Sequence, residues 1–258
     1  MDFLLSRHHA AELVLSIATV KHSATSDLPA DQTPLAHWSD GSPVGCPGSW
    51  RNHDTASARI KPTENPWTIL ILGLVLFLGI HSVHIVAPDA RSRFTAARGA
   101  GPWKGMFALV SALGLAAIVW GYAQARAQPV VLWPRIPGMA HLAALLTLVA
   151  FILLAAAYVP GNGIKARLHH PMVLAVMIWA AAHLLANTTL ASVVLFGSFL
   201  VWAGWSFRAA RQRDRSAGTV YSPGHLLATL IAVVVGAIAW ALMAFWGHGA
   251  WLGVRPLG

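Results

Sequence analysis

The sequence has few charged residues, and acidic residues are the scarcest of them. Only 10% of its 258 residues are charged, whereas a typical soluble domain carries about 25%, and 56% are hydrophobic. Nine Asp and Glu stand against 18 Lys and Arg. A chain this apolar does not stay solvated, so the composition excludes disorder for most of its length. It predicts an integral membrane protein instead.

Cysteine and intramembrane carboxylates are also missing. Cys46 is the single cysteine, which excludes internal disulfides, paired-cysteine redox motifs and thiolate zinc sites. Only two acids, Asp89 and Asp214, follow residue 64, so paired-carboxylate and two-metal chemistry lack their parts in the apolar region. The basic residues lie in short loops between apolar runs. That arrangement favours a lipid bilayer with an anionic surface as the partner, and we expect no nucleic acid.

Residues 1–64 differ from the rest of the chain. They hold seven of the nine acids and are rich in Ser, Asp, Pro and Gly. Their best apolar stretch, residues 13–20, is interrupted by polar residues and lacks the basic start and longer run of a signal peptide. We therefore expect a poorly ordered N-terminal extension over 1–64 and a transmembrane domain over 65–258. A second hypothesis places the true start downstream, near Trp67.

Six apolar runs after Pro66 are candidate membrane spans. They show no polar and apolar alternation, so they predict helices rather than barrel strands. The fourth is short for a crossing, which needs roughly 20 residues, and we expect it to form a hairpin with the fifth through residues 187–189. The fold class is thus all-α, a polytopic membrane helix bundle of about six transmembrane helices. The predicted spans are Ile69–Val86, Met106–Tyr122, Met139–Val159, Pro171–Ala186, Leu190–Phe207 and Leu226–Trp246.

The loop charges predict the orientation. One set of alternate loops holds ten Lys and Arg, and the other holds six if the bases nearest the first span are counted. Basic loops stay on the cytoplasmic side, so both termini should face outward. We expect a multi-pass protein of the inner (cytoplasmic) membrane.

Histidine is the residue type that remains for chemistry. Of 13 histidines, eight follow residue 64, and His81 and His183 lie deepest in apolar surroundings. Counting helical rise from the span ends puts His81 roughly 18 Å and His183 roughly 20 Å into the bilayer, from opposite faces. Ionisable side chains at that depth are functional candidates, and two imidazoles on antiparallel helices could ligate one haem iron. Trp179 and Asn187 lie four residues to either side of His183 on one stripe, where Asn187 could orient the ring.

The alternative for each histidine is structural. A single histidine in a helix bundle commonly bonds a carbonyl group of its own or a neighbouring helix and holds no metal. His169 and His170 precede Pro171, and that pattern is typical of a helix start with proline at the first position.

Residues 67 to about 215 resemble the NnrU family of bacterial membrane proteins. The last span is outside that resemblance. Seven segments carry it in order: GLVLFLGIHS (73–82), AP (87–88), WKG (103–105), VWGY (119–122), YVPGN (158–162), HPM (170–172) and WAAAHLLAN (179–187).

The resemblance implies a role in denitrification, because members of the family are needed for nitrite and nitric oxide reductase production. Its partners would be respiratory or denitrification proteins. The family is similar to 15-cis-ζ-carotene isomerase, a membrane enzyme that holds haem b through histidines. The ligand motifs of that enzyme correspond to His81 and His183 here. Its nearby cysteine corresponds to Ala180, so a redox-gated change of ligand is not expected.

The sequence leaves open whether the protein is an enzyme. The first hypothesis is a haem b membrane protein that supports denitrification. The second is a haem-dependent cis-trans isomerase of a polyene lipid, and the third is a non-catalytic membrane assembly factor. Residues 167–171 faintly resemble an element of isoprenylcysteine-type methyltransferases, but those enzymes need acids near their C-terminal cofactor site and none follows Asp214.

Overall fold

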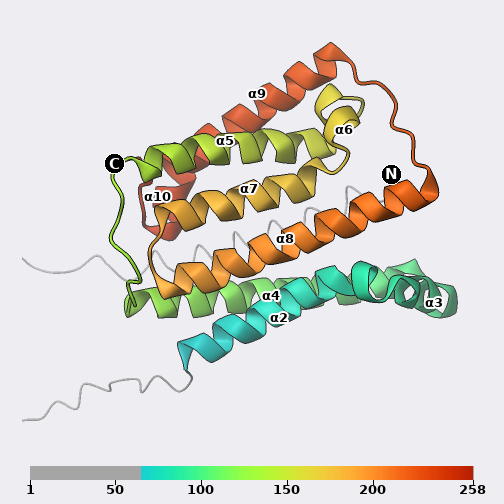
Figure 1. Cartoon of the computed structure of the whole chain (residues 1–258). Coiled ribbons are helices and arrows are strands. Elements are labelled where there is room, and N and C mark those ends of the chain that lie inside the picture. The colour runs from blue at the N-terminus through green and yellow to red at the C-terminus, as the bar shows by residue number, and fades with distance from the viewer. Residues whose placement is uncertain (1–64, 258) are drawn as a thin grey trace, which may run out of the picture. The chain divides into compact units, whose positions relative to one another are not determined.

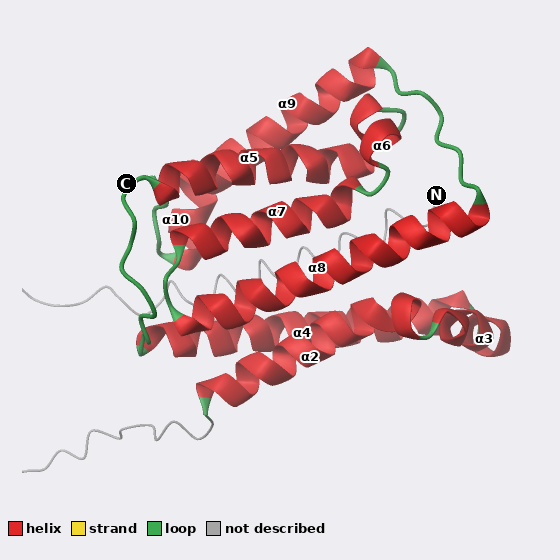
Figure 2. Ribbon diagram, viewed as in Figure 1, coloured by secondary structure: helices red, strands yellow, loops and turns green. Residues whose placement is uncertain are grey.

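The computed structural model describes residues 65–257, so the predicted N-terminal extension lies outside the described residues. The described part folds into helices joined by short loops and contains no β-strand, as the all-α prediction requires (Figures 1 and 2). The main helices are α2 (Pro66–Val86), α4 (Ala100–Ala127), α5 (Met139–Tyr158), α7 (Pro171–Ala186), α8 (Leu190–Ala217) and α9 (Leu226–Leu242). Shorter helices are α3 (Pro88–Arg98), α6 (Gly163–Leu168), the π-helical turn η2 (Met243–Gly247) and α10 (His248–Leu252).

The six main helices run back and forth between the same two ends of the domain (Figure 1). Five helical segments are long and apolar enough to cross a membrane, and α7 is a shorter apolar helix of 16 residues. Their outward faces carry large exposed apolar side chains, such as Val201 and Leu226, because lipid takes the place of water as their solvent. The prediction of a multi-pass helical membrane protein is confirmed.

The helices pack as an open series. α5 lies between α9 and α7, and α7 packs in turn against α8. α2 and α4 form a close pair on the other side of α8, which contacts both (Figure 1). α8 therefore joins the α2–α4 pair to the remaining helices, and the buried cluster around Leu195 and Phe196 of α8 also takes Leu70, Leu74 and Ile118 from α2 and α4.

The predicted hairpin is present. α7 ends at Ala186, α8 begins at Leu190, and Thr189 caps α8 by accepting a hydrogen bond from the Ser192 backbone N–H. The span boundaries differ from prediction at several ends. α8 runs ten residues beyond the predicted end at Phe207, because its last three turns carry arginines that lie outside any apolar run yet favour a helix.

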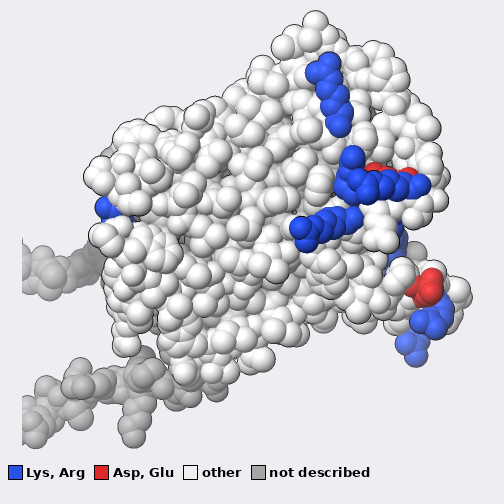
Figure 3. All heavy atoms as spheres, in the orientation of Figure 1, with Lys and Arg blue, Asp and Glu red and all other residues white. Residues whose placement is uncertain are grey.

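Charge is sorted between the two ends of the domain. The ten bases counted on one side in sequence belong to α3, the start of α4, α6 and the last turns of α8, and we call this end the basic end. Figure 3 shows these arginines and lysines gathered at one end of the domain, with few at the other. In the described residues the opposite end has only Arg126, Arg135 and Arg255. Membrane sidedness itself remains a prediction.

Candidate functional site

His81 lies on α2, where it faces α4 and α8. Its Nδ1 is 2.7 Å from the carbonyl oxygen of Phe77, one turn earlier. A carbonyl can only accept, so Nδ1 carries the proton and Nε2 of the neutral ring keeps its lone pair. The ring packs against Phe77 at 4.4 Å, Phe107 of α4 at 4.9 Å and Trp202 of α8 at 6.2 Å between centroids.

A hydrogen bond beside His81 fixes this face of α2 to α8. The Trp202 indole N–H donates to Ser82 Oγ at 3.1 Å, and that hydroxyl donates to the Leu78 carbonyl at 2.7 Å. Both groups are polar and sit among apolar helices, so leaving either unpaired would cost free energy. The pair therefore holds the wall of the His81 site in place.

His183 lies on α7 and repeats the local arrangement of His81. Its Nδ1 is 2.8 Å from the Trp179 carbonyl oxygen, again one turn earlier, so its Nε2 also keeps the lone pair. The ring stacks on Phe196 of α8 at 4.6 Å and contacts the Trp179 ring at 4.9 Å. Within the described part of the chain, no hydrogen bond involves Nε2 of either histidine.

The two residues predicted to orient His183 act differently from each other. Trp179 holds the imidazole through its backbone carbonyl, as well as through ring contact. Asn187 is the C-cap residue that directly follows α7, and its side-chain amide donates to the His183 backbone carbonyl at 2.9 Å instead of to the ring. Asn187 thus closes the helix end that carries His183. The stripe expected from four-residue spacing stops at Ala186, because the backbone of Asn187 is extended.

Both histidines contact α8, but at different levels along its axis. They contact it through Phe196 and Trp202, six residues apart, which is about 9 Å along a helix. The path of ring contacts from His81 to His183 runs through Phe77, Phe199 and Trp179, with centroid separations of 5.9 Å and 5.6 Å on either side of Phe199. A series of aromatic ring contacts therefore connects the two imidazoles.

Ala180 stands at the position where the resemblance to the isomerase leads one to expect a cysteine. Its side chain is fully buried in the cluster formed with Leu70, Leu195 and Phe196. A packed methyl group there offers neither a ligand nor a redox centre. Among the described residues, no group of three or more His, Cys, Asp or Glu is placed to hold a metal ion.

A second polar cluster, at the basic end, was not predicted from the sequence. Asp214 of α8 accepts hydrogen bonds from His170 Nε2 and from the Tyr221 hydroxyl, each at 2.8 Å. Arg211 donates to His169 Nδ1 at 2.6 Å, and the His169 ring stacks on Tyr221 at 4.1 Å. These contacts tie the α6–α7 turn to the end of α8 and the loop after it.

The cluster also has a structural role, because it lies at the start of α7, where the sequence predicts a helix start. Pro171 is the first residue of α7, and His169 precedes it with a left-handed φ of 65°, which turns the chain between α6 and α7.

Burial, and after it the hydrogen bond to Asp214, raises the pKa of the Tyr221 phenol above its usual value. In the sequence, the one sign of this cluster was Asp214, a single acid among arginines. Its partners could not be inferred from it, because they lie up to 44 residues away in sequence.

The helices and their apolar surface define a polytopic helical membrane protein. The chain matches the NnrU protein family over residues 69–256, and it belongs to that family. The match extends through α9 and α10, beyond the region where the motifs alone were similar. The chain matches no curated protein and no solved structure.

Proposed function

We propose that the protein binds haem b within the membrane, where Nε2 of His81 and Nε2 of His183 would hold the iron. One observation carries the proposal. Both imidazoles, on separate helices, donate a hydrogen bond from Nδ1–H to the carbonyl oxygen one turn earlier and leave Nε2 without a hydrogen-bond partner among the described residues. A hydrogen bond to the other ring nitrogen is the arrangement that sets the tautomer and orientation of metal-ligating histidines.

The donor set fits this group. A haem macrocycle supplies four of the iron ligands itself, so two neutral imidazoles complete the coordination without a third side chain. The aromatic rings around both histidines suit a flat apolar ligand, although Phe77, Phe199 and Trp179 would have to make room for it between the imidazoles. When bound, haem b would supply one-electron transfer or the binding of a small diatomic gas.

We further propose that the protein supports production of active nitrite and nitric oxide reductases. The support is membership of the NnrU family, over 69–256, and the family role given above. The chain would exclude water from the haem and hold it at a fixed depth, because the side chains around the histidines are aromatic and aliphatic. The isomerase hypothesis is weaker, because buried Ala180 replaces the cysteine of that enzyme.

Haem content tests the proposal directly. The full chain, expressed with ample haem and purified in detergent, should carry haem b with a Soret absorption band. His81→Ala and His183→Ala should each change the ligation and lower haem retention, and the double variant should lose nearly all of it. His141→Ala removes an exposed histidine at the start of α5 and is the matched control, which should keep full haem content.

The same variants separate the cofactor from an assembly role. In a denitrifying host that lacks its own copy, the wild-type chain and His141→Ala should restore nitrite and nitric oxide consumption, and the double histidine variant should not. A double variant that retains full function at normal membrane abundance would favour the non-catalytic assembly factor.

A further inference from the structure

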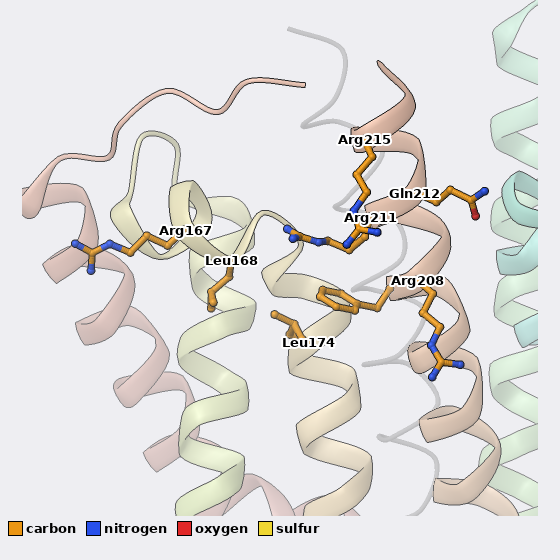
Figure 4. Close-up of a pocket in the computed structure, with 8 residues that line it drawn as sticks. Arg167, Leu168, Leu174, Arg208, Arg211, Gln212 and Arg215 are labelled. Carbon is orange, nitrogen blue, oxygen red and sulfur yellow. The ribbon is translucent and has the colours of Figure 1, made fainter. Parts of the chain in front are cut away.

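A pocket of about 820 Å³ opens at the basic end, between the α6–α7 segment and the last turns of α8 (Figure 4). We call it the arginine pocket. Four of its lining residues are arginines, namely Arg167, Arg208, Arg211 and Arg215. Leu174 and Phe207 are among its apolar lining residues. The haem proposal uses none of these residues.

The positive charge of the arginine pocket is not neutralised by its lining, which includes no acid. Asp214 is close in sequence, but its carboxylate accepts hydrogen bonds from His170 and Tyr221 and, among the described residues, forms no ion pair with these arginines. Arg211 donates to His169 Nδ1, which must be an uncharged acceptor, so Arg211 is positioned without losing its charge. Figure 4 shows Arg211 extending from α8 toward the α6–α7 segment, while Arg167 points away from α8.

An apolar strip leads from the arginine pocket along α8. Gly197, Gly204 and Arg211 are spaced by seven residues, so they lie on one face of the helix, and Arg208 and Arg215, also seven residues apart, both lie to one side of that stripe. A Cβ added at Gly197 or at Gly204 would meet nothing within 4 Å. The face below the arginines therefore has open space at two levels, bordered by exposed Val201 and Trp205.

We propose that the arginine pocket binds the phosphate of an anionic membrane phospholipid, with an acyl chain lying along the glycine strip of α8. Guanidinium groups suit phosphate oxygens because they donate paired hydrogen bonds. Basic pockets between membrane helices on the cytoplasmic side bind anionic lipid headgroups. The arginines and the glycine strip lie on neighbouring stripes of the same helix, so a phosphate held by the arginines would leave its acyl chain beside the strip.

The test uses the full chain in neutral detergent with phosphatidylglycerol, phosphatidylcholine or inorganic phosphate as the probe. Thermal stabilisation and native mass spectrometry should detect phosphatidylglycerol in preference to phosphatidylcholine. Each basic residue near an anionic headgroup contributes about fivefold in affinity. The double variant Arg208→Gln/Arg215→Gln should therefore bind phosphatidylglycerol about 25-fold more weakly, at unchanged haem content.

Two controls separate a built site from bulk charge and from free phosphate. Arg91→Gln/Arg93→Gln removes the same charge from exposed positions of α3 at the same end and should leave affinity unchanged. Gly204→Leu fills the strip and should weaken phosphatidylglycerol binding while leaving the arginines intact. Equal losses in the α3 variant, no preference for phosphatidylglycerol, or phosphate binding as tight as lipid with no effect of Gly204→Leu would each overturn the proposal.

Discussion

At the scale of single residues, polar side chains close the ends of helices that have no water to satisfy them. Asn162 is the best example, at 1% exposure between α5 and α6. Its amide N–H groups donate to the Ala156 and Val159 carbonyls at 2.8 and 2.5 Å, and its Oδ1 accepts from the Lys165 backbone N–H at 2.8 Å. One side chain thus ends one helix and begins the next.

Replacing Asn162 should therefore be costly. Asn162→Ala leaves two carbonyls and one N–H group without these partners, and we expect a loss of about 2–4 kcal/mol in stability. Thermal unfolding in detergent measures it. Asn162→Asp keeps the cap of α6 but loses both amide donors, so its stability should fall between the two. An Asn162→Ala protein as stable as the wild type would contradict this reading.

At this scale the sequence predicted where the two histidines lie better than it predicted which groups they contact. Depth in an apolar run singled out His81 and His183, and both rings do lie among packed helices. The carbonyl partners at Phe77 and Trp179 follow from one helical turn and could have been inferred. The prediction that Asn187 orients the His183 ring rested on helical spacing. That spacing does not apply, because α7 ends one residue before Asn187.

At the scale of helices, glycine sets the distance between α2 and α4. A Cβ at Gly121 would lie 2.5 Å from the backbone nitrogen of Leu70, and one at Gly114 would lie 2.8 Å from that of Phe77. Gly73 of α2 faces Ile118 in the same way, at 2.6 Å. Backbones that approach this closely gain packing contacts, which drive helix association where lipid competes for apolar surface.

Enlarging Gly121 should separate this pair. Gly121→Leu forces the backbones apart, and overpacking of this kind costs about 1–3 kcal/mol. Gly79→Leu is the matched control on α2, since an added Cβ there meets nothing within 4 Å. We expect thermal unfolding to detect the first change and to leave the second within about 0.5 kcal/mol of the wild type. Equal effects would show that helix spacing is not limiting.

The main helices were predictable because each is one long apolar run, and α3 and α6 were not because they are short and polar. α3 carries Pro88 at its first position and Asp89 in its first turn, both of which favour a helix start. α6 begins after Asn162, an N-cap residue. These helix-start signals are local and polar, whereas a membrane span is indicated by the length of an apolar run.

At the scale of the whole molecule, the ends of the helices sort by charge. Ten bases at the basic end and three at the other, among the described residues, predict that the basic end is cytoplasmic. The His81 and His183 contacts on α8 then place His81 nearer the cytoplasmic leaflet and His183 nearer the outer one. The arginine pocket would open to the cytoplasmic leaflet, where anionic headgroups are attracted to it.

Cysteine accessibility tests this orientation. In a Cys46→Ser background, Arg135→Cys lies in the α4–α5 loop and Thr219→Cys lies just after α8. A membrane-impermeant maleimide should label position 135 in intact spheroplasts and position 219 only after the membrane is permeabilised. The reverse pattern would invert the predicted topology and move the arginine pocket to the outer leaflet.

The optical spectrum of the purified protein, oxidised and then reduced, is the most direct test of the central claim that His81 and His183 together ligate one haem iron. The account predicts the spectrum of six-coordinate low-spin haem b in the wild type, and a shift to five-coordinate high-spin haem in His81→Ala and in His183→Ala. A protein without a Soret band after expression with ample haem, or a double alanine variant with an unchanged spectrum, would contradict it.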